Sequence, residues 1–312
     1  MKKYYLLALI GLLTILPGCS NPSFDEQTHL SVMVPNGIPS LTHLYLEVET
    51  LDNLTVTVDR VSGPQPLIAA FTSNSHDVII APLNLGANLY NKGVDYQLAS
   101  VITWGNLQLI SGTPLTSFGD LEGKEIIAFG ENSIPAMILE MLVETYGFTD
   151  EPTITYSANS AQESLMQLLH DSTRIVLTAE PITSRAIEQH PNTSIIDLGA
   201  VWETIMAQPL FPQAGIFIRK EVEEETRLKY LEAVESSITR VINNPEVAAD
   251  LAVSLDYPFD YDLLLASIPK SEMGYREALE SELAWFFDKI NAFNVELIGG
   301  TIPESDFYIH KP

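Results

Sequence analysis

Asparagine, glycine and proline recur directly after short apolar runs in this chain. Asn36-Gly37, Pro82-Leu83-Asn84 and Gly130-Glu131-Asn132 each follow a run with the length of a buried strand. An asparagine side chain offers a donor and an acceptor to a polar ligand, although its preference for turns explains the same positions equally well. The pattern indicates binding rather than bond-making chemistry.

Residues that commonly perform catalysis are sparse and scattered. Cys19 is the single cysteine, the six histidines form no His-x-x-x-His pair, and no Gly-x-Ser-x-Gly segment is present. A catalytic thiol, a zinc enzyme and a serine hydrolase are therefore not indicated. We expect no catalytic residue, no metal site and no cofactor.

The charge of the chain narrows the choice of partners. The 312 residues include 41 acidic and 16 basic side chains, which gives a net charge of -25. Such a surface repels nucleic acid and anionic lipid headgroups, so both are excluded as expected partners. The length suits one large or two medium domains, and a hydrophobic content of 46% provides an ample core.

The first 19 residues are typical of a targeting segment. Lys2 and Lys3 precede an apolar run from Leu6 to Leu16 that is too short to span a bilayer comfortably. Leu16-Pro17-Gly18-Cys19 resembles the lipobox of bacterial lipoproteins, in which the cysteine is acylated, for example by palmitate, and becomes the mature N-terminus. We expect residues 1–19 to be a signal peptide ending at the lipidated Cys19 and residues 20–28 to be a tether. The protein would then lie on the outer face of a cell membrane or in the periplasm, held by lipid alone.

Strand-like and helix-like segments alternate through the next part of the chain. A strand is expected over 124–129, followed by a helix that begins at Ser133, whose hydroxyl can cap the first turn, and ends at Gly147. Two such series predict an α/β protein with parallel sheets, βαβ crossovers and two lobes. Helical periods are also expected over 41–49, 221–243, 245–255 and 271–291.

Four stretches together resemble the substrate-binding lipoproteins of ABC importers, in the nitrate, sulfonate, taurine and thiamine-precursor-like family of type II periplasmic binding proteins. They are 77–93, with Asp77-Val78-Ile79-Ile80-Ala81-Pro82; 120–130, with Asp120-Leu121-Glu122-Gly123-Lys124; 176–181, ending in Ala179-Glu180-Pro181; and 299–308, from Gly299-Gly300 to Phe307-Tyr308. In the third stretch, Ala179 stands where the family has a proline. The resemblance implies two α/β lobes joined by two crossing strands, with a ligand cleft between them. By this analogy residues 29–109 and 212–312 form lobe 1, and residues 110–211 form lobe 2.

A cleft in such sheets lies at the carboxyl ends of the strands. This rule nominates the following ligand-binding residues: Asn36, Gly37, Pro82, Asn84, Trp104, Gly130, Asn132, Ser133 and Glu180. Trp104 could stack on a ring or pack in the hinge core, and Glu180 could bind an amine or complement the dipole of its own helix. Because these turns hold no basic residue, they favour a neutral or cationic ligand, such as a heterocyclic vitamin precursor, over a sulfonate or similar anion.

The resemblance implies a monomeric solute receptor that delivers a small organic molecule to an ABC permease and its ATPase. Two alternatives stay open. One is a sensor or adhesin lipoprotein on the same fold, and the other is an enzyme related to pyrimidine-forming members of the fold.

Overall fold

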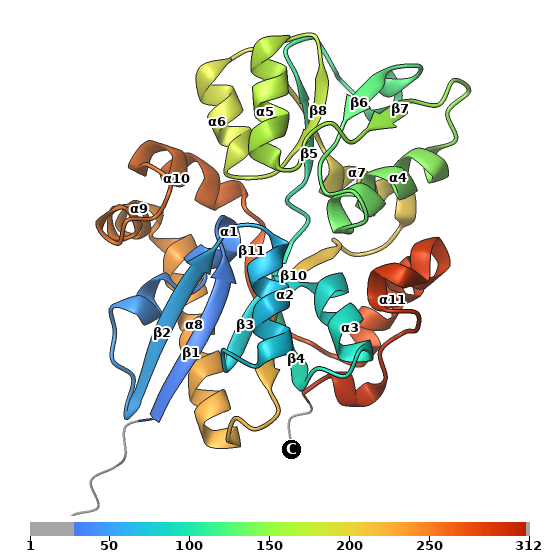
Figure 1. The fold of residues 1–312 in the computed structure, drawn as a ribbon. Helices are drawn as coiled ribbons and strands as arrows, with labels where there is room; N and C mark the ends of the chain where they lie inside the picture. The colour runs from blue at the N-terminus through green and yellow to red at the C-terminus, as the bar shows by residue number, and fades with distance from the viewer. Residues whose placement is uncertain (1–27, 310–312) are drawn as a thin grey trace, which may run out of the picture.

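Two β-sheets, each flanked by helices, form two lobes in the computed structural model, which describes residues 28–309 (Figure 1). The first sheet has six strands in the order β11-β4-β10-β3-β1-β2, and the second has five in the order β7-β6-β8-β5-β9. The α/β class predicted from the sequence is confirmed. The exact lobe boundaries at 109/110 and 211/212 stay a prediction.

The first sheet takes strands from both ends of the described chain. Its members are β1 (Thr28–Pro35), β2 (Leu54–Val61), β3 (Val78–Pro82), β4 (Tyr96–Trp104), β10 (Pro212–Arg219) and β11 (Met273–Glu277). Strands β1, β2 and β3 are parallel, whereas β10 runs antiparallel to both β3 and β4. The predicted parallel pairing holds for β1, β2 and β3, and β10 adds antiparallel pairs because it returns from the second lobe in the reverse direction.

The second sheet is built from the middle of the chain. It contains β5 (Gln108–Ser111), β6 (Glu125–Ile127), β7 (Thr153–Thr155), β8 (Ile175–Thr178) and β9 (Ser194–Asp197). Strand β6 is parallel to β7 and β8, and β5 is antiparallel to β8 and β9. The chain enters this lobe through residues 105–107 and leaves it through residues 207–211. These two passages are joined where the Gly105 amide donates to the Phe211 carbonyl oxygen at 2.8 Å.

Helices and short 3-10 turns cover both sheets. The first lobe holds α1 (Ile38–Leu41), η1 (Leu44–Glu47), α2 (Pro64–Ser73), α3 (Leu83–Asn91), α8 (Glu224–Asn243), α9 (Pro245–Ser254), α10 (Tyr261–Ser267), η3 (Ile268–Lys270), α11 (Glu280–Asn294), η4 (Val295–Ile298) and η5 (Ser305–Phe307). The second lobe holds η2 (Phe118–Leu121), α4 (Ile134–Tyr146), α5 (Ala161–His170), α6 (Ile182–Gln189) and α7 (Leu198–Met206).

Alternate side chains of β3 reach opposite faces of the first sheet. Ile79 joins a core that includes helices α2, α3 and α11, whereas Ile80 joins the core beneath α8 and α9. The packing of α3 is close: a Cβ added at Gly86 would lie 2.0 Å from Cζ of Phe217 on β10. Burial on both faces explains why β3 is a continuous apolar run without alternating polarity.

Helix α4 begins and ends near the predicted positions. Ser133 occupies the N-cap, and Gly147 ends the helix in the left-handed conformation at φ 74°. The expected capping bond is absent, however, because the Ser133 hydroxyl donates to the Gly130 carbonyl oxygen at 2.5 Å. The hydroxyl thus closes the preceding turn and does not receive a bond from a helix amide.

Two helical predictions are wrong. The segment 41–49 forms only the end of α1 and the 3-10 turn η1, and the segment 271–291 is divided into strand β11 and helix α11. Strand β11 pairs antiparallel with β4, a partner far away in the sequence, and this tertiary pairing overrides the local helical period. Helices α7 and α10 were not predicted.

Within residues 28–309, no helix is long and apolar enough to span a bilayer. The signal peptide, the lipidation site at Cys19 and the tether up to residue 27 lie outside the described residues.

Candidate functional site

The carboxyl ends of β1, β3 and β4 lie along one edge of the first sheet, because these strands share one direction (Figure 1). Five predicted residues follow or end these strands: Asn36, Gly37, Pro82, Asn84 and Trp104. Ala214 of β10 pairs with Pro82 on one side and with Thr103 on the other. The predicted residues of β3 and β4 are thus brought together across a single intervening strand.

Asn36 and Gly37 close the turn after β1. The exposed Asn36 side chain donates from Nδ2 to the Ser62 hydroxyl at 2.9 Å, and its backbone amide donates to the Val61 carbonyl oxygen at 2.8 Å. Gly37 adopts φ 111°, which favours glycine. These contacts give Asn36 a turn-forming role, while its side-chain oxygen has capacity for a further bond.

Asn84 lies in the first turn of α3 and is 7% exposed. Its Oδ1 is buried and has no hydrogen-bond partner among the described residues. A buried acceptor without a donor is costly, by about 1–3 kcal/mol. Asn84 is therefore a predicted residue whose hydrogen bonding is incomplete among the described residues.

Trp104 ends β4 and is also 7% exposed. Its Nε1 has no partner among the described residues, and the guanidinium carbon of Arg276 lies 4.2 Å from the centre of its ring. A cation over the ring is itself a favourable contact. The hinge packing considered from the sequence is thus present, and one face of the ring is already covered.

The second lobe presents the carboxyl ends of β6 and β8, which are parallel neighbours. The turn Gly130–Ser133 follows β6, and Glu180 follows β8. Thr178, the last residue of β8, has a buried hydroxyl with no partner in the described chain. Sequence reasoning missed Thr178 because a threonine inside an apolar run reads as an ordinary strand residue.

Glu180 is 5% exposed and is held by its own helix and by the hinge. Its Oε2 accepts from the Ser184 amide at 3.0 Å, and its backbone amide donates to Oδ1 of Asn106 at 2.8 Å. Burial raises the pKa of the Glu180 carboxyl, while the Ser184 bonds and the charge of Lys270 act in the opposite direction. Of the two roles considered for Glu180, the structure shows the contact with its own helix.

A pocket of about 270 Å³ lies between the lobes at the start of α4. Asn132 and Ser133 line it from the second lobe, and Phe293 and Asn294 line it from the end of α11 in the first lobe. Of the nine predicted binding residues, only Asn132 and Ser133 line this pocket; Glu180 and the residues of the first sheet do not.

The lining of this interlobe pocket is acidic and aromatic. It includes the carboxylates of Glu131 and Glu140 and the rings of Tyr156 and Phe293. The Tyr156 hydroxyl donates to Glu140, and burial together with this carboxylate raises the pKa of Tyr156 above its ordinary range. Carboxylates and aromatic faces suit a cationic or neutral ligand better than an anion.

No group of three or more His, Cys, Asp or Glu side chains in residues 28–309 is arranged to hold a metal ion. The polar groups that the fold collects at the two facing sheet edges are instead hydroxyls, amides and an indole N–H. These are groups that orient small organic ligands through hydrogen bonds.

The fold defines a class of protein: it is the two-lobed periplasmic binding protein fold. The chain is similar to a crystal structure of an ABC transporter from Parabacteroides distasonis, with 21% identity and a TM-score of 0.78, over 91% of this chain and 100% of that one. It is also similar to the periplasmic aliphatic sulphonate binding protein SsuA from Escherichia coli, with 14% identity and a TM-score of 0.70, over 91% and 92% of the two chains. The ligand binding component of an ABC-type import system from Staphylococcus aureus, with zinc bound, gives 12% identity and a TM-score of 0.70 over 91% and 97%.

Residues 52–256, more than half of the chain, match the family described as menaquinone biosynthesis, and the chain belongs to this family. No curated protein matches the sequence.

Proposed function

We propose that this protein is an extracytoplasmic solute-binding lipoprotein of an ABC importer. It captures a small organic molecule between its lobes and passes it, without chemical change, to a permease and its ATPase. The observation that carries this proposal is the presence of buried, unpartnered polar atoms on both facing sheet edges: Asn84 Oδ1 and Trp104 Nε1 in the first lobe, and Thr178 Oγ1 in the second. A ligand that bonds to both edges favours the closed arrangement, because only that arrangement makes both sets of contacts.

The expected ligand is neutral or cationic. Glu131 and Glu140 line the interlobe pocket, and no lysine or arginine of residues 28–309 does. The wider protein, at a net charge of -25, also opposes anions. The heterocyclic vitamin precursors expected from the sequence fit this environment better than the sulfonates do.

A thermal-shift screen of neutral, cationic and anionic heterocycles and amino-sulfonates tests the proposal. A ligand at 100 times its Kd stabilises the folded form by about 2.7 kcal/mol, which gives a clear rise in melting temperature. For the compound found, Asn84→Ala and Thr178→Val should each weaken binding, whereas Asn159→Ala, in an exposed loop, should not. Small-angle scattering should show a smaller radius of gyration with ligand, and an unchanged shape at saturation would contradict closure.

An enzymatic role in menaquinone biosynthesis is the second candidate, and the family match favours it. Deleting the gene in its own host separates the two functions. A solute receptor predicts loss of uptake of the compound found in the screen, with the menaquinone content unchanged. An enzyme predicts loss of menaquinone that a supplied later intermediate restores. The first proposal also includes a lipid anchor at Cys19, a monomeric state and a permease partner. Labelling of the wild type and of Cys19→Ser with a palmitate analogue tests the anchor.

A further inference from the structure

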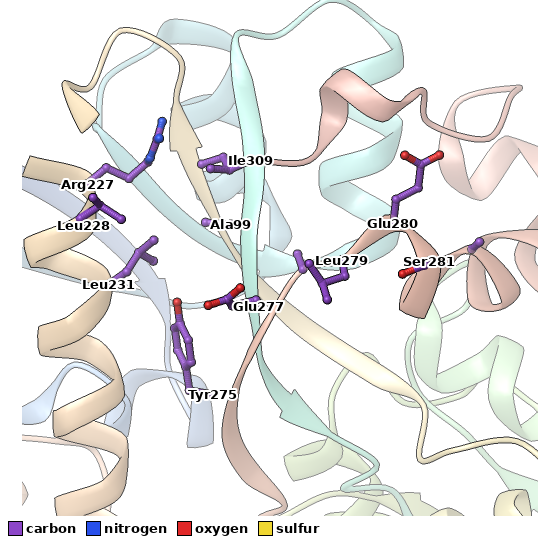
Figure 2. Close-up of a pocket in the computed structure, with 12 residues that line it drawn as sticks. Ala99, Arg227, Leu228, Leu231, Tyr275, Glu277, Leu279, Glu280, Ser281 and Ile309 are labelled. Atoms are coloured by element: carbon purple, nitrogen blue, oxygen red, sulfur yellow. The ribbon is translucent and has the colours of Figure 1, made fainter. Parts of the chain in front are cut away.

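A second pocket of about 620 Å³ lies wholly within the first lobe, and none of the predicted binding residues lines it (Figure 2). It opens beside the outer edge of β4, at the point where pairing with β11 ends and pairing with the C-terminal segment begins. The Ala278 amide at the end of β11 donates to the Ala99 carbonyl oxygen at 3.1 Å, and the Ile309 amide donates to the Leu98 carbonyl oxygen at 2.9 Å. The departing strand and the arriving C-terminal segment leave the pocket between them, with α8 as the opposite wall.

The walls of this β4-edge pocket are mainly apolar. Leu228 and Leu231 reach it from α8, Ile309 from the C-terminal segment and Leu279 from the start of α11 (Figure 2). Leu279 is 45% exposed, which is high for a large apolar side chain. The volume falls within the range of small-molecule sites, which are typically apolar with a few polar groups.

The polar groups of the pocket carry both signs of charge. Arg227 lines one side, while Glu277 and Glu280 line the other. The Arg227 Nε is buried without a hydrogen-bond partner, and no ion pair of the described residues includes Arg227. A buried donor of this kind calls for an acceptor. The two carboxylates and the charge of -25 disfavour an acceptor that is itself an anion.

Tyr275 adds a second donor beside Glu277. Its hydroxyl and the Glu277 carboxylate point into the space between α8 and the sheet edge (Figure 2). Burial, with smaller contributions from Glu277 and Glu235, raises the pKa of Tyr275 to about 12, so the hydroxyl keeps its proton at neutral pH. The pocket therefore presents donors to an uncharged acceptor and apolar walls to the body of the same molecule.

We propose that the β4-edge pocket is a second small-molecule site, which binds a neutral apolar ring compound carrying a carbonyl oxygen. The carbonyl accepts from Arg227, and the ring packs against Leu228, Leu231 and Ile309. Because every lining residue belongs to one lobe, occupancy does not require the lobes to close. The site is independent of the solute captured between them.

Three compounds with one ring system test the charge and the acceptor separately, by ligand-observed NMR titration of the full mature chain. We expect 2-acetylnaphthalene to bind best and naphthalene, which lacks the carbonyl, to bind about tenfold more weakly, as for loss of a hydrogen bond to a charged donor. The anion 2-naphthoate should also bind more weakly than the ketone. Tighter binding of the anion, or no binding of the ketone, overturns the proposal.

Variants then locate the site. Arg227→Met keeps the apolar stem and should remove the preference for the ketone over naphthalene. Ala284→Trp, which fills the pocket from α11, should abolish binding, while Ala292→Trp on the same helix but outside the lining should leave it intact. Melting temperatures establish that each variant is folded. Unchanged binding in Ala284→Trp overturns the proposal.

Discussion

The two flanks of the interlobe contact are built from different chemistry. On one flank, Arg185 of α6 forms an ion pair with Asp260 at the start of α10, at 2.5 Å, and the Lys270 amine donates to the Ser184 hydroxyl at 3.3 Å. On the other, the ring of Trp202 in α7 lies 6.1 Å from the ring of Trp285 in α11. An exposed ion pair can separate at a small cost in free energy, because water solvates both charges. Separating packed rings costs more, because it exposes apolar area to water.

Because of this difference, we expect the two flanks to behave differently when the lobes move. The aromatic flank is expected to stay packed as a fixed pivot, and the polar flank to open and close. A hinge of this kind needs only a few residues that absorb backbone rotation, and the passages at 105–107 and 207–211 provide them. Ala207 already adopts a left-handed conformation at φ 49°.

The largest effect is expected on the aromatic flank. Trp202 is fully buried, packs edge-on against Phe211 and donates from Nε1 to the Pro209 carbonyl oxygen at 3.1 Å. Trp202→Ala should lower the free energy of unfolding by about 3–5 kcal/mol, measured by urea denaturation. Trp285→Ala, at a partly exposed position, is the matched control and should cost less. Equal losses for the two variants would remove the argument for a buried pivot.

A smaller effect is expected at the hinge. Asn106→Ala removes the acceptor of the buried Glu180 amide and should cost about 1–3 kcal/mol in the free energy of unfolding. Asn36→Ala removes a hydrogen bond of similar length from an exposed turn and should cost less than about 0.5 kcal/mol. If both variants unfold at the same urea concentration, the Asn106 contact does not fix the hinge.

The polar flank should contribute still less to stability. Arg185→Ala removes a partly exposed ion pair and should change the free energy of unfolding by about 0.2–1 kcal/mol, less at high salt. Its distinguishing effect is on shape: the unliganded protein should have a larger radius of gyration by small-angle scattering. Lys229→Ala, which breaks the Lys229–Glu225 pair within α8, should leave the radius unchanged. An Arg185→Ala protein of unchanged shape would show that this ion pair does not hold the lobes.

The smallest expected effect is a pH dependence from Glu180. Because burial raises the pKa of this carboxyl above its ordinary value of 4.5, the folded state holds the proton more tightly than the unfolded state does. The associated stability is present below pH 4.5 and is lost as pH rises through the folded pKa. The difference in unfolding free energy between wild type and Glu180→Gln should therefore move against wild type as pH rises above 4.5. A flat difference from pH 4.5 to 7 would contradict this.

Local signals were sufficient for much of the fold. The strand before Gly130, the N-cap at Ser133 and the glycine stop at Gly147 follow from the preferences of neighbouring residues. Strand β11 could not be found in this way, because Met273–Glu277 is extended only through its pairing with β4. The same limit applies to the site: a strand end nominated Asn132, but the residues that face it across the lobes depend on packing between distant segments. Phe293, for example, reaches the pocket beside Asn132 from a helix about 160 residues further along the chain.

The direction of β1 has a consequence for delivery. This strand begins at Thr28 and runs toward the edge that faces the second lobe, so the described chain starts at the far end of the first lobe (Figure 1). With a lipid on Cys19, the nine residue steps to Thr28 extend to at most about 30 Å. The tether would thus be short, and the cleft between the lobes would face away from the bilayer. To deliver its solute to the permease, the protein would have to rotate relative to the membrane. Shortening the tether should therefore slow uptake before it changes the affinity for the solute.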